Sequence, residues 1–216
     1  MRQDIIDWVL ANRIVAIIRG FDPETCIRLA DAYYEGGIRM VEVTFPQAHP
    51  EDFHKTAEAI RAISDRFAGK VQVGAGTVLT REQLQMARDA GSRYMITPSV
   101  NTSLIREARE MGLVTMPGAM TPTEAVTAHE AGADFVKIFP AGALGPKYVK
   151  DIRAPLSHIR FLAVGGISPA NVADFMKAGC VGAGVGGELT NRDYIAAGAW
   201  DRIAAAAKTL MENSRV

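Results

Sequence analysis

The stretch TPTEAVTAHEAGADFVKIFP, residues 121–140, contains one complete helix–strand unit of the chain. The threonine and glutamate of TPTE have the spacing of a capping box, and the proline between them is favoured in the first helical turn. Gly132 stands where a left-handed glycine ends a helix. The run 135–139 that follows is apolar except for one lysine and has the length of a strand. The stretch therefore predicts a helix followed directly by a strand.

The same signals recur on both sides of this unit, with helix starts at Asp22-Pro23, Thr80 and Ser168-Pro169 and helix ends at Gly37, Gly91, Gly112 and Gly179. The predicted strands are residues 15–19, 39–44, 71–77, 94–97, 114–117, 135–139, 161–164 and 182–185. A helix at 3–11 precedes them, and an alanine-rich helix at 195–212 closes the chain. Eight alternating strands and helices are typical of a TIM barrel. We therefore expect a single α/β domain over residues 1–216, a (β/α)8 TIM barrel with an extra N-terminal helix. A doubly wound open sheet is the alternative.

Composition and charge argue against several classes of protein. The 24 basic and 24 acidic residues cancel without forming a basic tract, so we expect no nucleic-acid partner. No signal-peptide pattern and no bilayer-length apolar run is present, so we expect no membrane association. Cys26 and Cys180 are isolated, and we expect small buried thiols in a reducing cytoplasm. His49 and His54 do not share one helical turn cleanly, so we expect no metal site.

Lys137 lies in the middle of the predicted strand 135–139. Because side chains alternate along a strand, it shares a face with Phe135 and Phe139. Burial of an ammonium group is costly, so desolvation lowers the pKa of a lysine in such a place. An amine that is neutral part of the time can attack a carbonyl carbon. The sequence therefore predicts a Schiff-base lysine; the alternative is a structural lysine paired with a buried carboxylate.

Glu42 is the natural companion of Lys137, because it is the one charged residue of the apolar run 40–45. The two residues lie on the second and sixth predicted strands, which are opposite each other in an eight-stranded barrel and can contribute to one interior layer. A carboxylate near the lysine could move protons during imine formation and carbon–carbon bond cleavage. A buried glutamate–lysine pair without chemistry is the alternative.

Two glycine pairs, Gly165-Gly166 and Gly186-Gly187, follow the seventh and eighth predicted strands. Bare backbone there lets amide N–H groups approach a phosphate, helped by the helix start at Ser168-Pro169. The loops after these two strands are the usual phosphate site of such barrels. One pair alone is a weak signal, because turns also need glycine, but two pairs at these strands predict phosphate binding.

Thr77 and Arg19 also lie at predicted strand ends. Thr77 could donate its hydroxyl to a substrate carboxylate, or it could simply cap the strand. Arg19 could bind a carboxylate or a phosphate, or it could form a surface salt bridge. Both are candidate substrate-binding residues.

Together these residues resemble the 2-keto-3-deoxy-6-phosphogluconate (KDPG) aldolase family, including its 4-hydroxy-2-oxoglutarate and 2-keto-3-deoxy-6-phosphogalactonate aldolase members. The resemblance covers nearly the whole chain and rests on IVAIIR at 14–19, VEVT at 41–44, GAGTV at 74–78, Thr97-Pro98, Pro117-Gly118, KIFP at 137–140 and Gly165-Gly166. It implies a homotrimer of (β/α)8 barrels that needs no cofactor.

The resemblance also implies roles for single residues. Lys137 would form the Schiff base and Glu42 would be the general acid and base. Thr77 would hold the pyruvate carboxylate, and Pro98 and Phe139 would line the pocket. The implied activity is class I cleavage of a small 2-keto acid, a 2-keto-3-deoxy-6-phospho sugar acid of gluconate or galactonate type, to pyruvate and glyceraldehyde 3-phosphate.

The chain departs from the family pattern at three places. Phe45-Pro46-Gln47 stands where many members have an arginine, a charge that Arg19 could replace. Gly187, with Glu188 beside it, replaces the serine common in the last phosphate loop, which removes a hydroxyl donor and adds a carboxylate. AVGG at 163–166 and AGC at 178–180 are more similar to the phosphogalactonate branch.

Three other functions stay open on the sequence. One is an aldolase for an unphosphorylated 2-keto acid such as 4-hydroxy-2-oxoglutarate. The others are a phosphosugar isomerase or epimerase with Glu42 as its base, and a non-catalytic phosphosugar-binding protein. The buried lysine argues against the last two, because neither needs an amine with a lowered pKa.

Overall fold

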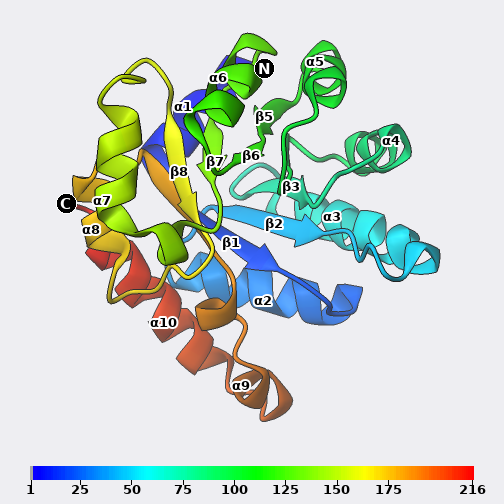
Figure 1. Cartoon of the computed structure of the whole chain (residues 1–216). Helices are drawn as coiled ribbons and strands as arrows, with labels where there is room; N and C mark the ends of the chain where they lie inside the picture. Colours follow the sequence, from blue (N-terminus) through cyan, green and yellow to red (C-terminus); the bar gives the residue numbers. More distant parts are fainter. Residues whose placement is uncertain (1) are drawn as a thin grey trace.

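Parallel pairing joins the strands into one sheet in the order β5-β4-β3-β2-β1-β9-β8-β7-β6. The computed structural model describes residues 2–216. Its strands are β1 (Ile14–Ile18), β2 (Met40–Thr44), β3 (Gln72–Gly76), β4 (Tyr94–Ile96), β5 (Val114–Met116), β6 (Gly118–Ala119), β7 (Val136–Ile138), β8 (Phe161–Val164) and β9 (Gly182–Val185). The order does not reverse, which rules out the doubly wound alternative. Because β5 and β6 are consecutive in the chain yet lie at opposite ends of this order, the sheet is a nearly closed TIM-like barrel (Figure 1).

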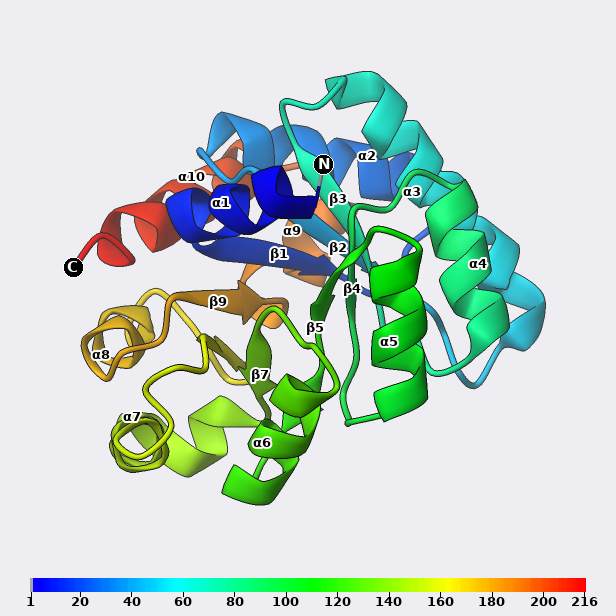
Figure 2. The ribbon, with the colours of Figure 1, turned by 90° about the horizontal axis from the view of Figure 1, so that it is seen from above.

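Helices surround the strands. They are α1 (Arg2–Asn12), α2 (Pro23–Glu35), α3 (Phe53–Phe67), α4 (Arg81–Asp89), α5 (Thr102–Glu110), α6 (Pro122–Glu130), α7 (Ala141–Arg153), α8 (Val172–Lys177), α9 (Arg192–Ala196) and α10 (Trp200–Asn213), with the short 3₁₀ helices η1 (Pro50–Asp52) and η2 (Gly187–Leu189). Figure 2 shows α2 and α10 on one side of the strands and α6 and α7 on the other. The helices other than α1 thus form the outer layer of an α/β barrel.

The capping chemistry predicted for α6 is present. The backbone N–H of Glu124 donates to Thr121 Oγ1 at 3.3 Å, and the backbone N–H of Thr121 donates to the Glu124 carboxylate at 2.8 Å. Asp22 caps α2 by accepting from the backbone N–H of Thr25 at 2.9 Å. These bonds fix where each helix begins and therefore the length of the loop before it.

Two predicted elements have different bounds in the structure. The predicted strand 114–117 ends at Met116 as β5, because Pro117 has no N–H to donate to a neighbouring strand, and pairing resumes beyond the predicted range in β6. The predicted final helix, 195–212, is instead α9 and α10. Gly198, with a φ of 66°, lies in the left-handed region between them. Both corrections come from a proline or glycine whose backbone interrupts a regular element.

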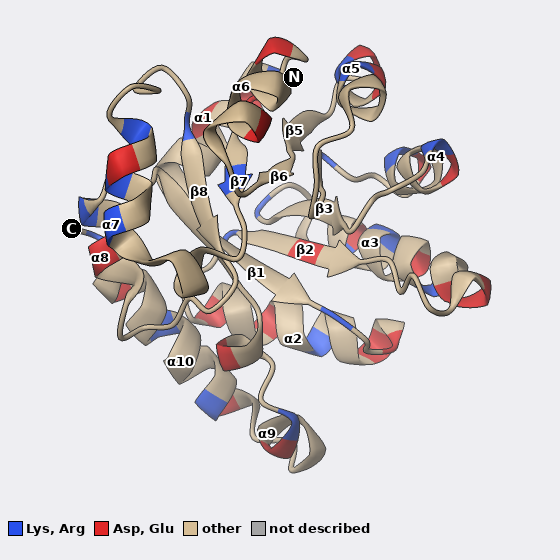
Figure 3. Ribbon diagram, viewed as in Figure 1, with Lys and Arg blue, Asp and Glu red and all other residues tan. Residues whose placement is uncertain are grey.

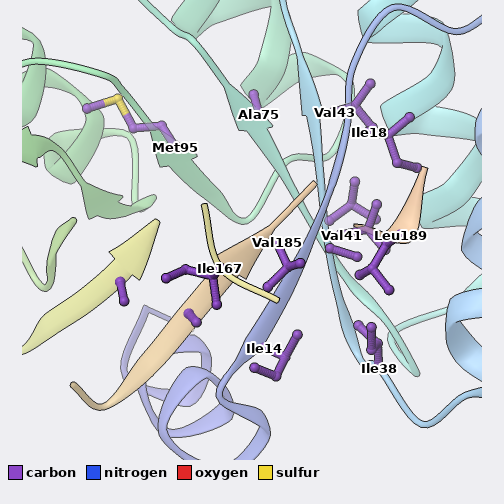
Figure 4. Close-up of a cluster of buried hydrophobic side chains, with 14 of the residues drawn as sticks. Ile14, Ile18, Ile38, Val41, Val43, Ala75, Met95, Ile167, Val185 and Leu189 are labelled. Carbon is purple, nitrogen blue, oxygen red and sulfur yellow. The ribbon is translucent and has the colours of Figure 1, made fainter. Parts of the chain in front are cut away.

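Alternation along the strands divides the core into two layers. Outward-facing side chains such as Ile14, Val41 and Val185 pack with the helices, and Figure 4 shows these three close together with Leu189. Inward-facing side chains form a second cluster that includes Val15, Met40, Tyr94, Phe135 and Leu162. The interior of the barrel is therefore filled at the level of these residues.

α1 contributes to the interior cluster rather than to the outer layer. Its Ile5, Ile6 and Val9 are buried with inward-facing residues near the beginnings of the strands, including Val15 and Met40. Arg2 forms an ion pair with Asp134, which lies just before β7. α1 therefore closes the amino-terminal end of the barrel and leaves the carboxyl-terminal end open.

Candidate active site

Charged residues are rare within the strands. Of the nine strands that the structure describes, only β2 and β7 contain one, Glu42 and Lys137 respectively. Figure 3 shows the corresponding red band in β2 and blue band in β7. On one side of the barrel, β1, β9 and β8 separate the two strands, so β2 and β7 are opposite each other as predicted. The negatively charged and the positively charged residue therefore lie on opposite sides of the same barrel.

Both side chains are almost completely removed from water. Glu42 is 2 % exposed and Lys137 is 6 % exposed. Burial lowers the pKa of Lys137, with the Arg19 charge acting in the same direction and the Glu42 charge opposing it. Burial likewise raises the pKa of Glu42, against the opposing charges of Lys137 and Arg19. The amine therefore loses its proton more easily than an ordinary lysine, as nucleophilic attack requires.

The surroundings of Glu42 provide room but few partners. A Cβ atom at Gly76 would lie 1.8 Å from Glu42 Oε1, so only a glycine leaves space for the carboxylate. Among the described residues, Glu42 Oε2 is the buried side-chain polar atom that has no hydrogen-bond partner. Buried polar atoms are normally paired, and exceptions concentrate where function requires them. This oxygen can therefore accept a proton from a bound molecule or, when protonated, donate one to it.

Lys137 is held by its own strand and by Phe139. The backbone N–H of Lys137 donates to Pro117 O at 2.9 Å, so the break between β5 and β6 lies directly beside the lysine. Lys137 Nζ lies 4.8 Å from the centre of the Phe139 ring, within the range of a cation–π contact. The alternation predicted for this strand is thus present, with both side chains on the inner face.

A cavity of about 620 Å³ opens above the Glu42–Lys137 pair. Its lining includes Arg19 and Phe139, and also both glycine pairs, Gly165-Gly166 and Gly186-Gly187. Eight of the ten predicted site residues therefore meet in one space at the carboxyl-terminal ends of the strands. This volume is typical of small-molecule sites.

The glycine pairs give one side of the cavity a surface of backbone amides. Gly165 and Gly166 have φ values of 88° and 72°, which a residue with a Cβ adopts only with strain. Within residues 2–216, none of the amides of Gly165, Gly166, Gly186 and Gly187 donates a hydrogen bond to another protein group. Free N–H groups of this kind suit an anion such as phosphate.

Thr77 and Pro98 follow β3 and β4 but do not line the cavity. Thr77 has a φ of 55°, an unusual value for a β-branched residue. Gln47 Nε2 donates to Thr77 O at 2.7 Å. Gln47, in the segment where many family members have an arginine, thus binds the loop after β3 instead of placing a charge there. The substrate-binding roles of Thr77 and Pro98 stay predictions.

Several lining residues were not predicted from the sequence, namely Ile17, Val164, Ile167, Ser168, Gly184, Glu188 and Thr190. Alternation with Arg19 could have identified Ile17, and alternation with Gly186 could have identified Gly184. Glu188 was noted only as a neighbour of Gly187, and the structure adds its carboxylate to the cavity wall. Ser168 was noted only as part of a helix start beside Gly165-Gly166, and Thr190 had no distinguishing signal.

The remaining titratable candidates lie elsewhere. Cys26 and Cys180 are buried and unpaired as expected, and burial raises the pKa of each thiol to about 12. In residues 2–216 no group of three or more histidine, cysteine, aspartate or glutamate side chains is arranged to hold a metal ion. No described helix combines the length and apolar character needed to span a membrane.

Comparison with known proteins gives consistent matches. Residues 5–206 match the family model described as KDPG and KHG aldolase. The chain is 38 % identical over 185 residues to 2-dehydro-3-deoxy-6-phosphogalactonate aldolase of Escherichia coli K12, covering 85 % of this chain and 87 % of that one. It is 34 % identical over 201 residues to 2-dehydro-3-deoxy-phosphogluconate aldolase of Treponema pallidum, covering 93 % and 92 %. A solved native KDPGal structure superposes with a TM-score of 0.84 at 36 % identity and covers 94 % of each chain.

Proposed function

Because the chain belongs to the KDPG and KHG aldolase family and is therefore a lyase, we propose that it cleaves a 2-keto-3-deoxy-6-phospho sugar acid by a class I mechanism. The products would be pyruvate and glyceraldehyde 3-phosphate. The observation that carries the proposal is the buried Lys137 facing the buried Glu42 beneath an open cavity. The isomerase and binding-protein alternatives receive no support from this family.

In the proposed mechanism, the neutral amine of Lys137 attacks the C2 carbonyl carbon of the substrate. Glu42 donates a proton to the carbinolamine hydroxyl, which leaves as water and gives the imine. Glu42 then accepts the proton of the C4 hydroxyl. The C3–C4 bond breaks, its electron pair moves into the imine, and the aldehyde leaves. Protonation of the resulting enamine at C3 and hydrolysis release pyruvate and regenerate the amine.

The glycine loops supply the proposed site for the phosphate at the far end of the substrate. Four glycine amides that donate to no described protein group line the cavity there, and a phosphate accepts several such bonds. Arg19 lines the same cavity and could pair with the phosphate or the carboxylate of the substrate. The similarity to phosphogalactonate and phosphogluconate aldolases supports a phosphorylated substrate, and either configuration at C4 fits it.

The decisive experiment is borohydride reduction with and without pyruvate, followed by peptide mass spectrometry. We expect a pyruvate-dependent adduct on Lys137, because hydride reduces the imine to a stable secondary amine. Lys137→Ala removes the amine, so both the adduct and turnover should fall to background. Retained turnover in Lys137→Ala, or an unmodified Lys137 in active wild-type protein, would refute the mechanism.

An aldolase for an unphosphorylated substrate such as 4-hydroxy-2-oxoglutarate is the second candidate. Glu188 favours it, because a carboxylate in the cavity wall repels a phosphate. Measuring kcat/KM for both substrates with the same enzyme distinguishes the two. A higher value for the phosphorylated acid supports the first proposal, and a higher value for 4-hydroxy-2-oxoglutarate supports the second.

We further propose that β5 and β6 act as one strand of a (β/α)8 barrel to which α1 is an addition, and that residues 1–216 are one domain. β5 and β6 are consecutive in the chain, and they pair with β4 and β7 respectively. This arrangement supports a count of eight barrel strands. The family resemblance supports a homotrimer without a cofactor. A metabolic lyase with two free cysteines suits the cytoplasm.

A further inference from the structure

Tyr33 makes a hydrogen bond that joins two distant parts of the chain. It lies on α2, and its hydroxyl donates to Leu189 O at 3.0 Å, across 156 residues of sequence. Tyr33 and Leu189 are both 0 % exposed. The bond is therefore shielded from water, where a hydroxyl and a carbonyl group each need a partner.

Leu189 belongs to the segment 186–190, which supplies Gly186, Gly187, Glu188 and Thr190 to the cavity wall. Three bonds close this segment on itself at Gly186 O: from Leu189 N at 2.8 Å, from Thr190 N at 3.1 Å and from Thr190 Oγ1 at 3.1 Å. Within residues 2–216, the Tyr33 hydroxyl makes the hydrogen bond that ties the segment to a different element. The position of the Gly186 and Gly187 amides thus depends on a group outside the cavity.

We propose that Tyr33 is a positioning residue for the phosphate-binding end of the cavity, an inference that rests on the proposed function. The glycine pair gives the segment conformational freedom. If the segment were not anchored, it would lose this freedom on binding an anion, and the lost entropy would weaken binding. The Tyr33 hydroxyl holds Leu189 O, the internal bonds carry that restraint to Gly186, and the free amides stay in place before substrate arrives. The anchored segment contacts the phosphate end of the substrate and not the imine-forming end.

This role predicts an effect that depends on the substrate. Tyr33→Phe removes one oxygen atom and keeps the ring that packs in the outer core. KM for the phosphorylated 2-keto-3-deoxy acid should rise by about fivefold, the effect of one lost hydrogen bond. Its kcat should change by less than about twofold, because Lys137 and Glu42 are untouched. Pyruvate carries no phosphate, so the pyruvate concentration that gives half-maximal borohydride trapping should stay at the wild-type value.

Tyr148→Phe is the matched control. Its hydroxyl also donates to a backbone carbonyl, that of Met120, in a loop that does not line the cavity. We expect no selective rise in KM for the phosphorylated substrate in this variant. A purely structural role for Tyr33 would instead weaken pyruvate trapping and the phosphorylated reaction in parallel.

Three results would overturn the inference. They are an unchanged KM in Tyr33→Phe, parallel losses with pyruvate and with the phosphorylated acid, and a wild-type enzyme that does not prefer the phosphorylated acid to 4-hydroxy-2-oxoglutarate. The proposed function fails separately, through the absence of a pyruvate adduct on Lys137 in wild-type protein, and that result would also remove the basis for Tyr33. An intact adduct with unchanged KM in Tyr33→Phe rejects only the role of Tyr33.

Discussion

The pKa values of Glu42 and Lys137 lie closer together than those of an ordinary glutamate and an ordinary lysine. Burial raises the pKa of the carboxyl group and lowers that of the amine, while the attraction between the two charges opposes both changes. Smaller separation of the two pKa values reduces the cost of moving a proton between groups that act at the same substrate. A buried pair of this kind contributes little to stability, and the role that we propose for it is proton transfer.

Arg19 and Glu42 should move the pH dependence of imine formation in opposite directions. The Arg19 charge lowers the pKa of Lys137, so Arg19→Gln should raise it and shift the acid limb of the pyruvate-trapping rate to higher pH. The Glu42 charge raises that pKa, so Glu42→Gln should shift the limb to lower pH while also reducing the maximal rate. Trapping rates measured from pH 5 to 10 give the midpoint independently of the amplitude.

Arg28→Gln is a suitable control for these two variants. Arg28 is an exposed arginine of α2 that pairs with Glu24, and it does not line the cavity. Its substitution should leave the midpoint unchanged. Shifts of the same sign in Arg19→Gln and Glu42→Gln would contradict the assignment of the acid limb to Lys137.

At the scale of elements, α1 closes the amino-terminal end of the barrel. Ile6→Ala should lower the free energy of unfolding by about 2–4 kcal/mol, because the cavity left beside inward-facing side chains cannot collapse fully. Pyruvate trapping in folded protein should persist, since the site opens at the other end. Urea unfolding of Ile6→Ala beside Gln3→Ala, at an exposed position of the same helix, measures this. A loss below about 1 kcal/mol would show that α1 is not part of the core.

Element types could be predicted from the sequence because caps, glycine stops and apolar runs are local signals. The capping box at Thr121 and the strand around Lys137 are both present. The interruption at Pro117 depends on the pairing of β5 and β6 with different neighbours, which a single strand pattern does not reveal. The left-handed backbone of Thr77, and the hydrogen bond that its carbonyl accepts from Gln47 thirty residues away in sequence, likewise have no local sequence signal.

The buried charged residues of the candidate site were more predictable than its outer parts. A charged residue within an apolar strand is conspicuous, so Glu42 and Lys137 could be identified, and barrel geometry placed them opposite each other. Tyr33 gave no signal, because a tyrosine on the buried side of an amphipathic helix is usually a core residue. Its role became visible only when the fold placed α2 beside Leu189.

At the scale of the whole molecule, we predict a homotrimer with a sedimentation mass three times the 23.2-kDa chain mass. Leu79 and Met120 are large apolar side chains exposed in the described chain, in the loops after β3 and β6, and a subunit contact through these loops would bury them. Met120→Glu should then shift the protein toward smaller species in analytical ultracentrifugation. A monomeric wild-type protein at micromolar concentration would reject the prediction.

The close approach of the Glu42 side chain to the backbone of Gly76 limits which mutations the codon for residue 76 can accept. Every glycine codon begins with two guanines, and every missense change of one nucleotide in it encodes an amino acid that carries a Cβ atom. At position 76 that atom would lie 1.8 Å from the Glu42 carboxylate oxygen. Spontaneous point mutation therefore offers this codon only silent or damaging changes, so in a library of all single variants selected for growth on the substrate, this position should keep glycine.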